Sequence, residues 1–540
     1  MIDLLASTVL VPFACAALAL AMPARLARWC AALGSAVVLG IGAYALADFA
    51  RHPGAEFRFV TSTTWSESFG ASWTFGVDGI GAAMLALSGL IALVATIQAW
   101  RETERPRAYH ALVLALLGAI DGVFVALDLL VFFVCWELML APMLALIGLW
   151  GGEQRRYAAM KFFVFTLAGS ALMLVLIVAL WATTPAGGRD APIAAELLAA
   201  QSSDGGLTLH GLDVVRDASG AAAVHVPRGF DVRHLALQWR AFTSIDFLGI
   251  PLAAFGFLAV LIACLVKLPA VPLHTWLPHA HVQAPTAISV LLAGVLLKLG
   301  VFGLYRIAWP LFPEQAIAWG PALGVLGVVG ILWGGWVALG QGDLKRLVAY
   351  TSVSHMGICL LGLASLTTAG AVGGIVQAVA HGLSSSLAFL LVGVVYERAH
   401  HRRVDGFGGI AAVMPRFAKL FLFASLAGAG LPALAGFVGE FLVWMGAFTG
   451  EAPFPVLAAC AIPSVVVMAA CLLSATRRVL YGPLRHPEHA AFADCDRREL
   501  AATLPLVVFI VLLGLWPAPL VDAVRPACEA LVHHVRSAIP

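Results

Sequence analysis

The chain has 540 residues, of which 61% are hydrophobic and 11% are charged. Soluble globular domains are about 45–50% apolar, so this composition excludes a soluble globule and indicates a polytopic membrane protein. The formal net charge of +2 lacks the basic excess that is typical of nucleic-acid-binding proteins.

The cysteines and the first residues exclude further classes. The nine cysteines are scattered, mostly in apolar runs, and form no C-x-x-C motif, so neither a disulfide framework nor a metal cluster is predicted. The N-terminal stretch Met1-Ile-Asp lacks the positively charged region of a signal peptide and runs straight into apolar sequence. We therefore expect it to begin the first transmembrane helix.

Apolar runs recur along the whole chain. With about 20 apolar residues for each crossing, the sequence predicts about fourteen transmembrane helices. They are expected near residues 3–21, 28–50, 77–99, 109–127, 128–149, 157–181, 246–267, 284–306, 316–340, 345–366, 370–396, 417–447, 455–480 and 500–520. The long connection 183–244 is rich in Gly, Ala and Asp, and we expect an outer insertion whose role the sequence does not define.

Lysine and arginine divide the connections between these helices into two sets. Most of them fall in alternate connections, beginning with the one that follows the first helix. The other short connections carry only Arg51, Arg58 and Arg306, and the C-terminal tail carries Arg525 and Arg536. Because these residues accumulate in cytoplasmic loops, both termini are predicted on the outer side of the membrane.

Two lysines are expected deep in the membrane. Lys267 ends an apolar run and is followed at once by Pro269 and Pro272, which predicts a helix that breaks at the charge. Lys298 is expected in the middle of the next helix. An ammonium at the membrane centre costs about 2.5–3.5 kcal/mol on insertion scales, so each needs a compensating interaction. The role is either structural, through snorkelling or bridging, or a proton relay; Lys161, one turn inside its helix, is expected to snorkel.

One carboxylate stands in an unbroken apolar run. Glu137 lies in Phe133-Val-Cys-Trp-Glu137-Leu-Met-Leu-Ala-Pro142, and a buried carboxylate needs a partner. It is either a structural, hydrogen-bonded group or a group that modulates a lysine, and Lys267 is the expected lysine.

A second break is predicted near Pro432. The stretch Gly430-Leu-Pro432-Ala-Leu-Ala-Gly436-Phe-Val-Gly-Glu440 repeats the Leu-Pro-Ala that follows Lys267. Interrupted helices in corresponding halves are typical of inverted repeats in transporters. On this hypothesis Lys267 ends the polar path of one half and Glu440 that of the other, with Lys298 between them.

Five histidines lie near these groups. His355 and His381 stand in apolar helices beside hydroxyl side chains, and they are candidate relay groups because histidine titrates near neutrality. The alternative is that they are hydrogen-bonded packing residues. His274, His279 and His281 flank a turn and are expected to be wet. A metal site is not predicted there, because a proline precedes His279 and no Cys or carboxylate stands beside it.

Several long motifs resemble one family. They are Trp136-Glu-Leu-Met-Leu-Ala-Pro142, Tyr157-Ala-Ala-Met-Lys161, Lys267-Leu-Pro-Ala-Val-Pro-Leu-His-Thr-Trp-Leu-Pro278, Leu291-Leu-Ala-Gly-Val-Leu-Leu-Lys298, Asp343-Leu-Lys-Arg-Leu-Val-Ala-Tyr-Thr-Ser-Val-Ser-His355 and Gly436-Phe-Val-Gly-Glu440. From about Phe75 to Val521 the chain resembles the antiporter-like membrane subunits of bacterial NADH:quinone oxidoreductase (respiratory complex I), most closely the subunit M group, whose mitochondrial counterpart is subunit 4.

The resemblance implies an all-α polytopic membrane fold with fourteen helices. It contains two inverted five-helix repeats, and the seventh and twelfth helices are discontinuous. The implied divisions are 1–107 with helices 1–3, 108–308 as the first repeat including the loop 183–244, 309–481 as the second repeat, and 482–540 as the C-terminal helix and tail.

The resemblance also implies roles. Glu137 would pair with Lys267, Lys298 would be the central relay with His355 and His381, and Glu440 would be the exit carboxylate. The chain would transport protons in a bacterial cytoplasmic membrane, with the neighbouring antiporter-like subunits among its partners. It would hold no redox cofactor, because NADH, FMN, iron–sulfur clusters and quinone are expected in partner subunits.

The chain departs from the family pattern at four positions of interest. The family usually has an acidic residue where this chain has His279, and often Glu where it has Gln283. At the second break the family has Gly and Asn where this chain has Ala433 and Ala435. These changes keep every proposed relay residue, but they leave the hydration of the second break and a divergent host complex as open questions.

Two other functions share this fold or these charges. One is a subunit of a multi-chain cation/proton antiporter or of a membrane-bound hydrogenase-type complex. The other is a scaffold in which the buried charges are satisfied and no proton moves. Proton and Na⁺ transport measurements separate all three.

Overall fold

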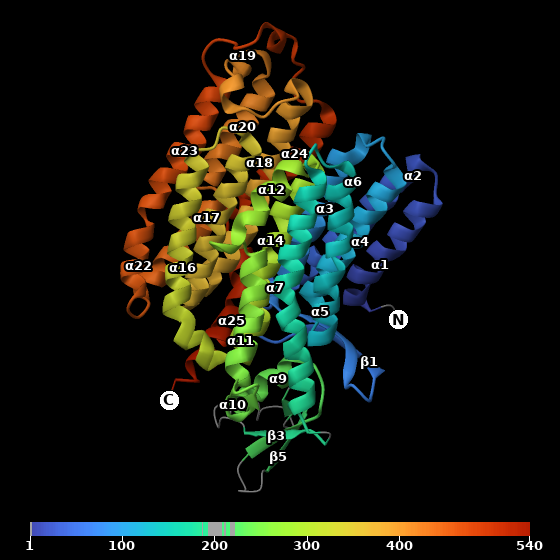
Figure 1. Cartoon of the computed structure of the whole chain (residues 1–540), viewed down its shortest axis with the longest axis vertical. Helices are drawn as coiled ribbons and strands as arrows, with labels where there is room; N and C mark the ends of the chain where they lie inside the picture. Colours follow the sequence, from blue (N-terminus) through green and yellow to red (C-terminus); the bar gives the residue numbers. More distant parts are fainter. Residues whose placement is uncertain (1–2, 186, 193–207, 210–211, 217–221, 540) are drawn as a thin grey trace.

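The computed structural model describes residues 3–185, 187–192, 208–209, 212–216 and 222–539. Within this part of the chain, twelve helices are long and apolar enough to cross a membrane. Two further crossings are each built from two shorter helices that meet at a break, α11 (Leu252–Lys267) with α12 (Trp276–Gln283) and α20 (Pro415–Gly428) with α21 (Ala435–Thr449). The predicted all-α fold with discontinuous seventh and twelfth helices is confirmed (Figure 1).

The helices before the insertion follow the predicted spans closely. They are α1 (Leu4–Ala21), α2 (Ala24–Arg51), α3 (Gly79–Gln98), α4 (Pro106–Val125), α5 (Leu129–Leu138), α6 (Leu140–Trp150) and α7 (Arg155–Thr183). The sequence analysis did not predict the antiparallel hairpin of β1 (Arg58–Ser66) and β2 (Ala71–Val77), whose exposed strand residues alternate too weakly to be recognised.

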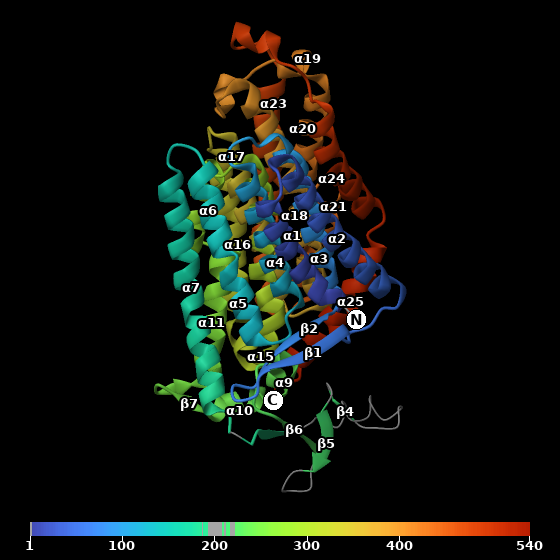
Figure 2. The ribbon, with the colours of Figure 1, turned by 90° about the vertical axis from the view of Figure 1, so that its right-hand side faces the viewer.

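The described part of the insertion after α7 lies at one end of the bundle (Figures 1 and 2). Its strands pair in the order β3-β6-β5-β4, and the helices α9 (Val232–Leu237) and α10 (Trp239–Ser244) follow. The strands are β3 (Arg189–Pro192), β4 (Thr208–Leu209), β5 (Leu212–Arg216) and β6 (Ala222–Val226). The predicted helix 246–267 begins only at Leu252, because β7 (Asp246–Phe247) and β8 (Ile250–Pro251) form a tight hairpin before it.

The remaining helices complete the first half and build the second half and the C-terminal part. They are α13 (Thr286–Leu291), α14 (Leu297–Gly303), α15 (Trp309–Leu311), α16 (Pro313–Leu339), α17 (Leu344–Ala364), α18 (Thr368–Ala399), α19 (Ile410–Val413), α22 (Phe454–Ala461), α23 (Pro463–Leu480), α24 (Arg497–Leu515) and α25 (Ala518–Arg536). The segments η3 (Leu292–Leu296) and η4 (Leu304–Ala308) are π-helical and flank α14 within one continuous helix.

The C-terminal helix α25 was predicted as a tail. It is amphipathic, with Leu520, Val524 and Cys528 buried and charged residues such as Arg525 on the other side, and it packs against α2, α3 and α18. Its polar positions hide it from a search for apolar runs, whereas a 3.6-residue period would have indicated it.

The centre of the bundle is the helix that runs from Thr286 to Leu311. All residues of its apolar 18-residue stretch are buried inside the protein, whereas only 28% of the corresponding stretch of α24 is buried. A lysine on this helix therefore cannot reach lipid or solvent by extending its side chain. The two broken helices start at opposite ends of the bundle, as the inverted repeats require (Figures 1 and 2). The division at residues 107, 308 and 481 stays a prediction.

Both chain ends lie toward the end of the bundle that carries the insertion, and the first turns of α7 and α17 lie toward the other (Figures 1 and 2). Arg306 was predicted in a short outer connection, and the structure corrects this. It is 7% exposed within η4 and forms an ion pair with Asp78, the N-cap residue of α3, at 2.7 Å. The ion pair explains how an arginine is tolerated between packed helices, because a buried charge needs a hydrogen-bonded partner.

Candidate functional site

The first broken helix ends at Lys267. The amide of Leu268 bonds the carbonyl of Cys264 at 2.7 Å, after which Pro269 and Pro272 supply no N–H and the chain leaves the helix. The lysine side chain is 1% exposed. The break therefore places an ammonium group inside the bundle, as the sequence predicts.

Trp136 and Met139 hold the ammonium of Lys267. Its Nζ donates to the carbonyl of Trp136 at 3.1 Å and approaches the sulfur of Met139 at 3.2 Å. The same Nζ lies 4.1 Å from the centroid of the Trp136 ring, a cation–π contact. One residue thus contributes both a carbonyl dipole and a π face, which offset part of the cost of burying the charge.

Glu137 lies beside this group without touching it. The described residues contain no ion pair within 4.0 Å between Glu137 and Lys267, although the two groups interact electrostatically. One carboxylate oxygen, Oε1, is buried without a hydrogen-bond partner. The two predicted partners therefore interact through space, and the structure does not show the direct ion pair that the resemblance implies.

Lys298 is fully buried in α14, between the two π-helical segments. Its Nζ donates to the carbonyl of Ala293, which lies in η3, and is 2.7 Å from Nδ1 of His381. When Lys298 is protonated, its ammonium group can only donate hydrogen bonds. Nδ1 of a neutral His381 then accepts from it, and the proton of the ring lies on Nε2. Irregular π-helical turns recur at functional sites, and here one places a carbonyl at the ammonium.

A line of titratable groups continues from His381. The rings of His381 on α18 and His355 on α17 have centroids 5.3 Å apart, and Nε2 of His355 is 3.8 Å from Oε1 of Glu440 on α21. All three side chains are buried. Lys298, His381, His355 and Glu440 come from four separate helices, and we call this set the Lys298–Glu440 chain.

The second break packs its backbone against Glu440. Helix α20 ends at Gly428, and the amide of Leu431 bonds the carbonyl of Leu426 at 3.1 Å. Gly430 has a φ of +70°, and a Cβ there would lie 2.6 Å from Oε2 of Glu440. Only glycine satisfies both conditions, so the motif Gly430-Leu-Pro brings the loop onto the carboxylate.

Gln377 belongs to the site and was not predicted as a site residue. It lies on α18 one turn before His381, it is 1% exposed, and its side chain lies close enough to Glu440 to interact with the carboxylate. Its own Oε1 has no partner. A neutral residue gives no charge signal in an apolar helix, but its spacing of four residues from His381 places both on one face.

The predicted surroundings of His281 and Lys345 were wrong, because the structure buries both residues. His281 was expected to be wet, but it is fully buried, stacks on Phe389 with ring centroids 4.3 Å apart, and has no hydrogen-bond partner at either ring nitrogen. Lys345 was counted with the inner loops, but it is 3% exposed and donates to the carbonyl of Ala284 at 2.7 Å. Both errors have one cause, since α12 folds into the bundle after the break, which buries its own His281 and places the carbonyl of Ala284 over Lys345 of α17.

The other predicted groups occupy the same region. His274 was also expected to be wet, but it is buried at 7% exposure and lies near Tyr350, so that prediction is wrong as well. His279 is partly buried, and its Nδ1 lies 2.9 Å from the carbonyl oxygen of Thr275. Lys161 lies beside the rings of Tyr157 and Phe165 near the start of α7. No group of three or more metal-ligating side chains occurs in the described part of the chain.

Comparisons with known proteins show the family to which the chain belongs. Residues 126–191 and 236–465 match the family described as NADH:quinone oxidoreductase/Mrp antiporter, TM. A relative from Pseudomonas aeruginosa, named NADH-quinone oxidoreductase subunit M, is 37% identical over 510 residues, which cover 92% of this chain and 90% of the relative. The chain belongs to the family of antiporter-like membrane subunits of NADH:quinone oxidoreductase.

Other members of the family are equally extensive matches to this antiporter-like subunit. NAD(P)H-quinone oxidoreductase chain 4 1 of Synechococcus sp. (strain JA-3-3Ab) is 36% identical over 529 residues, which cover 96% of this chain and 90% of the relative. A chain of the solved structure named respiratory complex I from Thermus thermophilus with bound NADH superposes with a TM-score of 0.80 at 30% identity, covering 98% of this chain and 99% of that one. Antiporter-like subunits therefore share the whole fold described above.

Proposed function

We propose that this antiporter-like subunit is the proton-translocating subunit M of a bacterial NADH:quinone oxidoreductase. Electron transfer from NADH to quinone takes place in partner subunits that hold the FMN, the iron–sulfur clusters and the quinone, and this subunit moves protons in response. Its partners are the other membrane subunits of the complex, above all the neighbouring antiporter-like ones.

The observation that carries this proposal is the Lys298–Glu440 chain. Proton transfer along a relay needs titratable groups separated by a hydrogen bond or by one water. The separations from Lys298 to His381 and from His355 to Glu440 are 2.7 and 3.8 Å. Nε2 of His381 and Nδ1 of His355 are buried without a hydrogen-bond partner among the described residues, so both nitrogens are free to take part in proton transfer.

The Lys267 cluster supplies the gate in this proposal. Lys267 rests on the Trp136 carbonyl and ring, and Glu137 is close enough to attract it. Movement of the ammonium toward Glu137 changes the electrostatic field at the next lysine, which alters the proton affinity there. This step requires only that the long side chain of Lys267 moves, while the helices stay in place.

We further propose a bacterial cytoplasmic (inner) membrane location with both termini on the periplasmic side. The insertion and both chain ends lie toward one end of the bundle, while the arginine-rich first turns of α7 and α17 lie toward the other (Figure 1). This asymmetry supports the orientation, because arginine and lysine favour the cytoplasmic side.

The test is proton uptake driven by NADH oxidation in inverted membrane vesicles. Lys267→Ala is compared with the native chain, after complex assembly has been verified in both. The proposal expects assembled mutant complex with proton uptake reduced together with quinone reductase activity. Unchanged NADH-driven uptake, together with loss of Na⁺ movement driven by an imposed pH gradient, would instead assign the chain to a cation/proton antiporter.

A further inference from the structure

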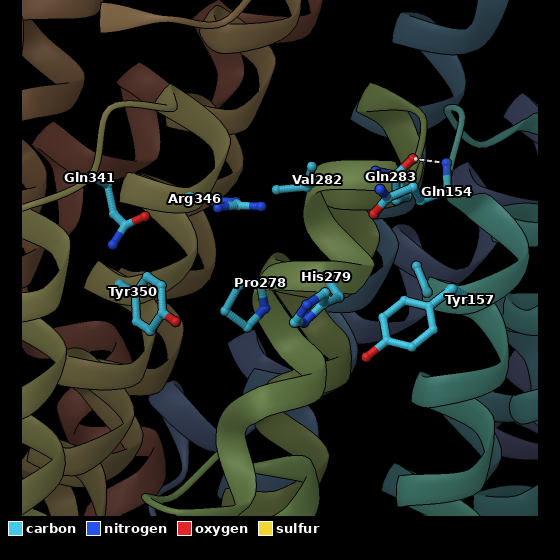
Figure 3. A pocket seen from close by; sticks show the side chains of 10 residues that line it. Gln154, Tyr157, Pro278, His279, Val282, Gln283, Gln341, Arg346 and Tyr350 are labelled. Atoms are coloured by element: carbon cyan, nitrogen blue, oxygen red, sulfur yellow. Dashed lines mark hydrogen bonds between the residues drawn. The ribbon is translucent and has the colours of Figure 1, made fainter.

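A polar cavity of about 220 Å³ lies beside α12, between the first turns of α7 and α17 (Figure 3). Its polar lining consists of three glutamines, Tyr157, Tyr350, His279 and Arg346. These side chains offer amide, hydroxyl, imidazole and guanidinium donors, and no carboxylate lines the cavity. A donor-rich cavity without a negative charge suits an anion.

Arg346 supplies the positive charge of this cavity. Figure 3 shows its guanidinium directed across the cavity toward α12. In the described part of the chain the guanidinium has neither an ion pair nor a hydrogen bond, because Asp343, three residues earlier, pairs with Arg402 at 3.2 Å. Arg402 also donates to the carbonyl of Val282 at 2.8 Å. The carboxylate of Asp343 is thus occupied by Arg402, and the charge of Arg346 is left for a ligand.

A second cavity of about 480 Å³ adjoins the first and shares Arg346 and Gln283 with it. Arg402 and Arg403 line it, together with the carboxylates of Glu153 and Asp343. Arg402 pairs with Asp343 and Arg403 with Asp405, so among the arginines that line the two cavities only Arg346 has no carboxylate of a described residue within 4.0 Å. A ligand seated at Arg346 can extend from the first cavity into the second.

Two residues of α12, His279 and Gln283, line the first cavity without bringing a carboxylate to it. A carboxylate at either position would be a competing partner for Arg346. Gln283 instead accepts a hydrogen bond from the amide of Gln154 at 3.0 Å, which ties α12 to the start of α7 and closes one side of the cavity.

The cavity lies at a membrane boundary. Gln154 precedes α7 and Arg346 lies in the first turn of α17, both of which span the membrane. Phosphate headgroups occupy this level, and basic pockets between transmembrane helices bind acidic headgroups. A guanidinium matches the oxygens of a phosphate with two parallel hydrogen bonds, and the tyrosine and glutamine donors complete the shell.

We propose that this cavity binds the phosphate group of an anionic phospholipid from the adjacent membrane leaflet, with Arg346 as the anchoring cation. The acyl chains lie along the outer surfaces of α7 and α17. The bound lipid connects the start of α17 to α12. Helix α17 carries Lys345 in its first turn and His355 near its middle. The proposal does not depend on proton transport, because it rests on the cavity alone.

The experiment uses the assembled complex that contains the full chain, purified and delipidated in detergent. Phosphatidylglycerol is titrated in, with phosphatidylcholine of the same acyl chains as the control, and lipid retention is measured by native mass spectrometry of this subunit. Arg346→Gln and His279→Glu are compared with Arg156→Gln, a matched exposed arginine in the first turn of α7 that does not line the cavity.

We expect Arg346→Gln to weaken phosphatidylglycerol retention by about tenfold, the loss of one or two charge-assisted hydrogen bonds. His279→Glu should weaken it similarly, and Arg156→Gln should leave it unchanged. Equal retention in Arg346→Gln and Arg156→Gln would overturn the proposal, as would equal binding of phosphatidylcholine. Displacement of the lipid by millimolar inorganic phosphate with full recovery of thermal stability would assign the cavity to a free anion and overturn the lipid source.

Discussion

At the scale of residues, buried charges and their polar neighbours account for the candidate site. Lys267, Lys298 and Glu440 could be predicted because a charge in an apolar helix is costly and needs a reason. Gln377 could not, because a buried amide carries no such signal, and its contact with Glu440 depends on how α18 and α21 pack.

The first prediction concerns Gln377. Gln377→Leu removes the amide that orients the Glu440 carboxylate, so proton uptake in inverted vesicles should fall several-fold while the complex still assembles. Gln377→Asn, which keeps a donor on a shorter side chain, should recover part of the activity. Gln238→Leu, a change at another buried glutamine outside the relay, is the control and should leave uptake unchanged. Equal uptake in Gln377→Leu and the native chain would remove Gln377 from the site.

The second prediction concerns Ala433, which has a φ of +72°. An L-residue in this left-handed region costs about 1–2 kcal/mol relative to glycine, and the family pattern has glycine here. Ala433→Gly should therefore raise the unfolding temperature of the purified complex subunit. Ala435→Gly lies at the start of α21, where glycine weakens a helix by about 1 kcal/mol, so it should lower that temperature. A lower unfolding temperature for Ala433→Gly would contradict the inference that the backbone at Ala433 is strained.

At the scale of elements, apolar periodicity located the membrane helices and proline located their breaks. It did not locate α25, whose polar face resembles a tail, or the β1–β2 hairpin. Nor could it show that Arg306 faces Asp78, since the two residues lie 228 positions apart and meet only when α3 packs on the central helix.

The third prediction tests that buried ion pair. Asp78 accepts from Arg306 and also caps α3 through the amide of Gly81 at 2.8 Å. Asp78→Ala removes both interactions and should destabilise the subunit by about 3–5 kcal/mol, as for other buried pairs that lose one partner. Asp78→Asn keeps the cap and should destabilise it less. The measurement is the amount of assembled complex and its unfolding temperature, and an equal effect of both changes would show that the cap contributes nothing.

At the scale of the whole molecule, two inverted halves meet at the central helix that carries Lys298. The two breaks together with the family resemblance were sufficient to predict this arrangement. The broken helices are the seventh and the twelfth, and the odd number of crossings between their starts puts these starts at opposite ends of the bundle. The folding of α12 into the bundle, which buries His281 and Lys345, could not be predicted, since the sequence there resembles an exposed turn.

The fourth prediction concerns orientation. Single cysteines introduced at Ser537 and Arg156 lie near opposite ends of the bundle and are exposed. A membrane-impermeant thiol reagent should label Ser537→Cys from the periplasmic side and Arg156→Cys only after the membrane is opened. Among the nine native cysteines, all of which the structure describes, only Cys460 is exposed. In a Cys460→Ala background we therefore expect little labelling of the native cysteines. The reverse labelling pattern would place both termini in the cytoplasm.

The central claim is that protons pass along the Lys298–Glu440 chain. The most direct measurement is the rate of NADH-driven proton uptake by assembled complex carrying His355→Phe, which keeps a ring of similar shape between His381 and Glu440 but cannot hold a proton. We expect uptake to fall by about tenfold or more with assembly intact, as for the loss of a proton-transfer group. Uptake at the native rate in a fully assembled complex would contradict the account.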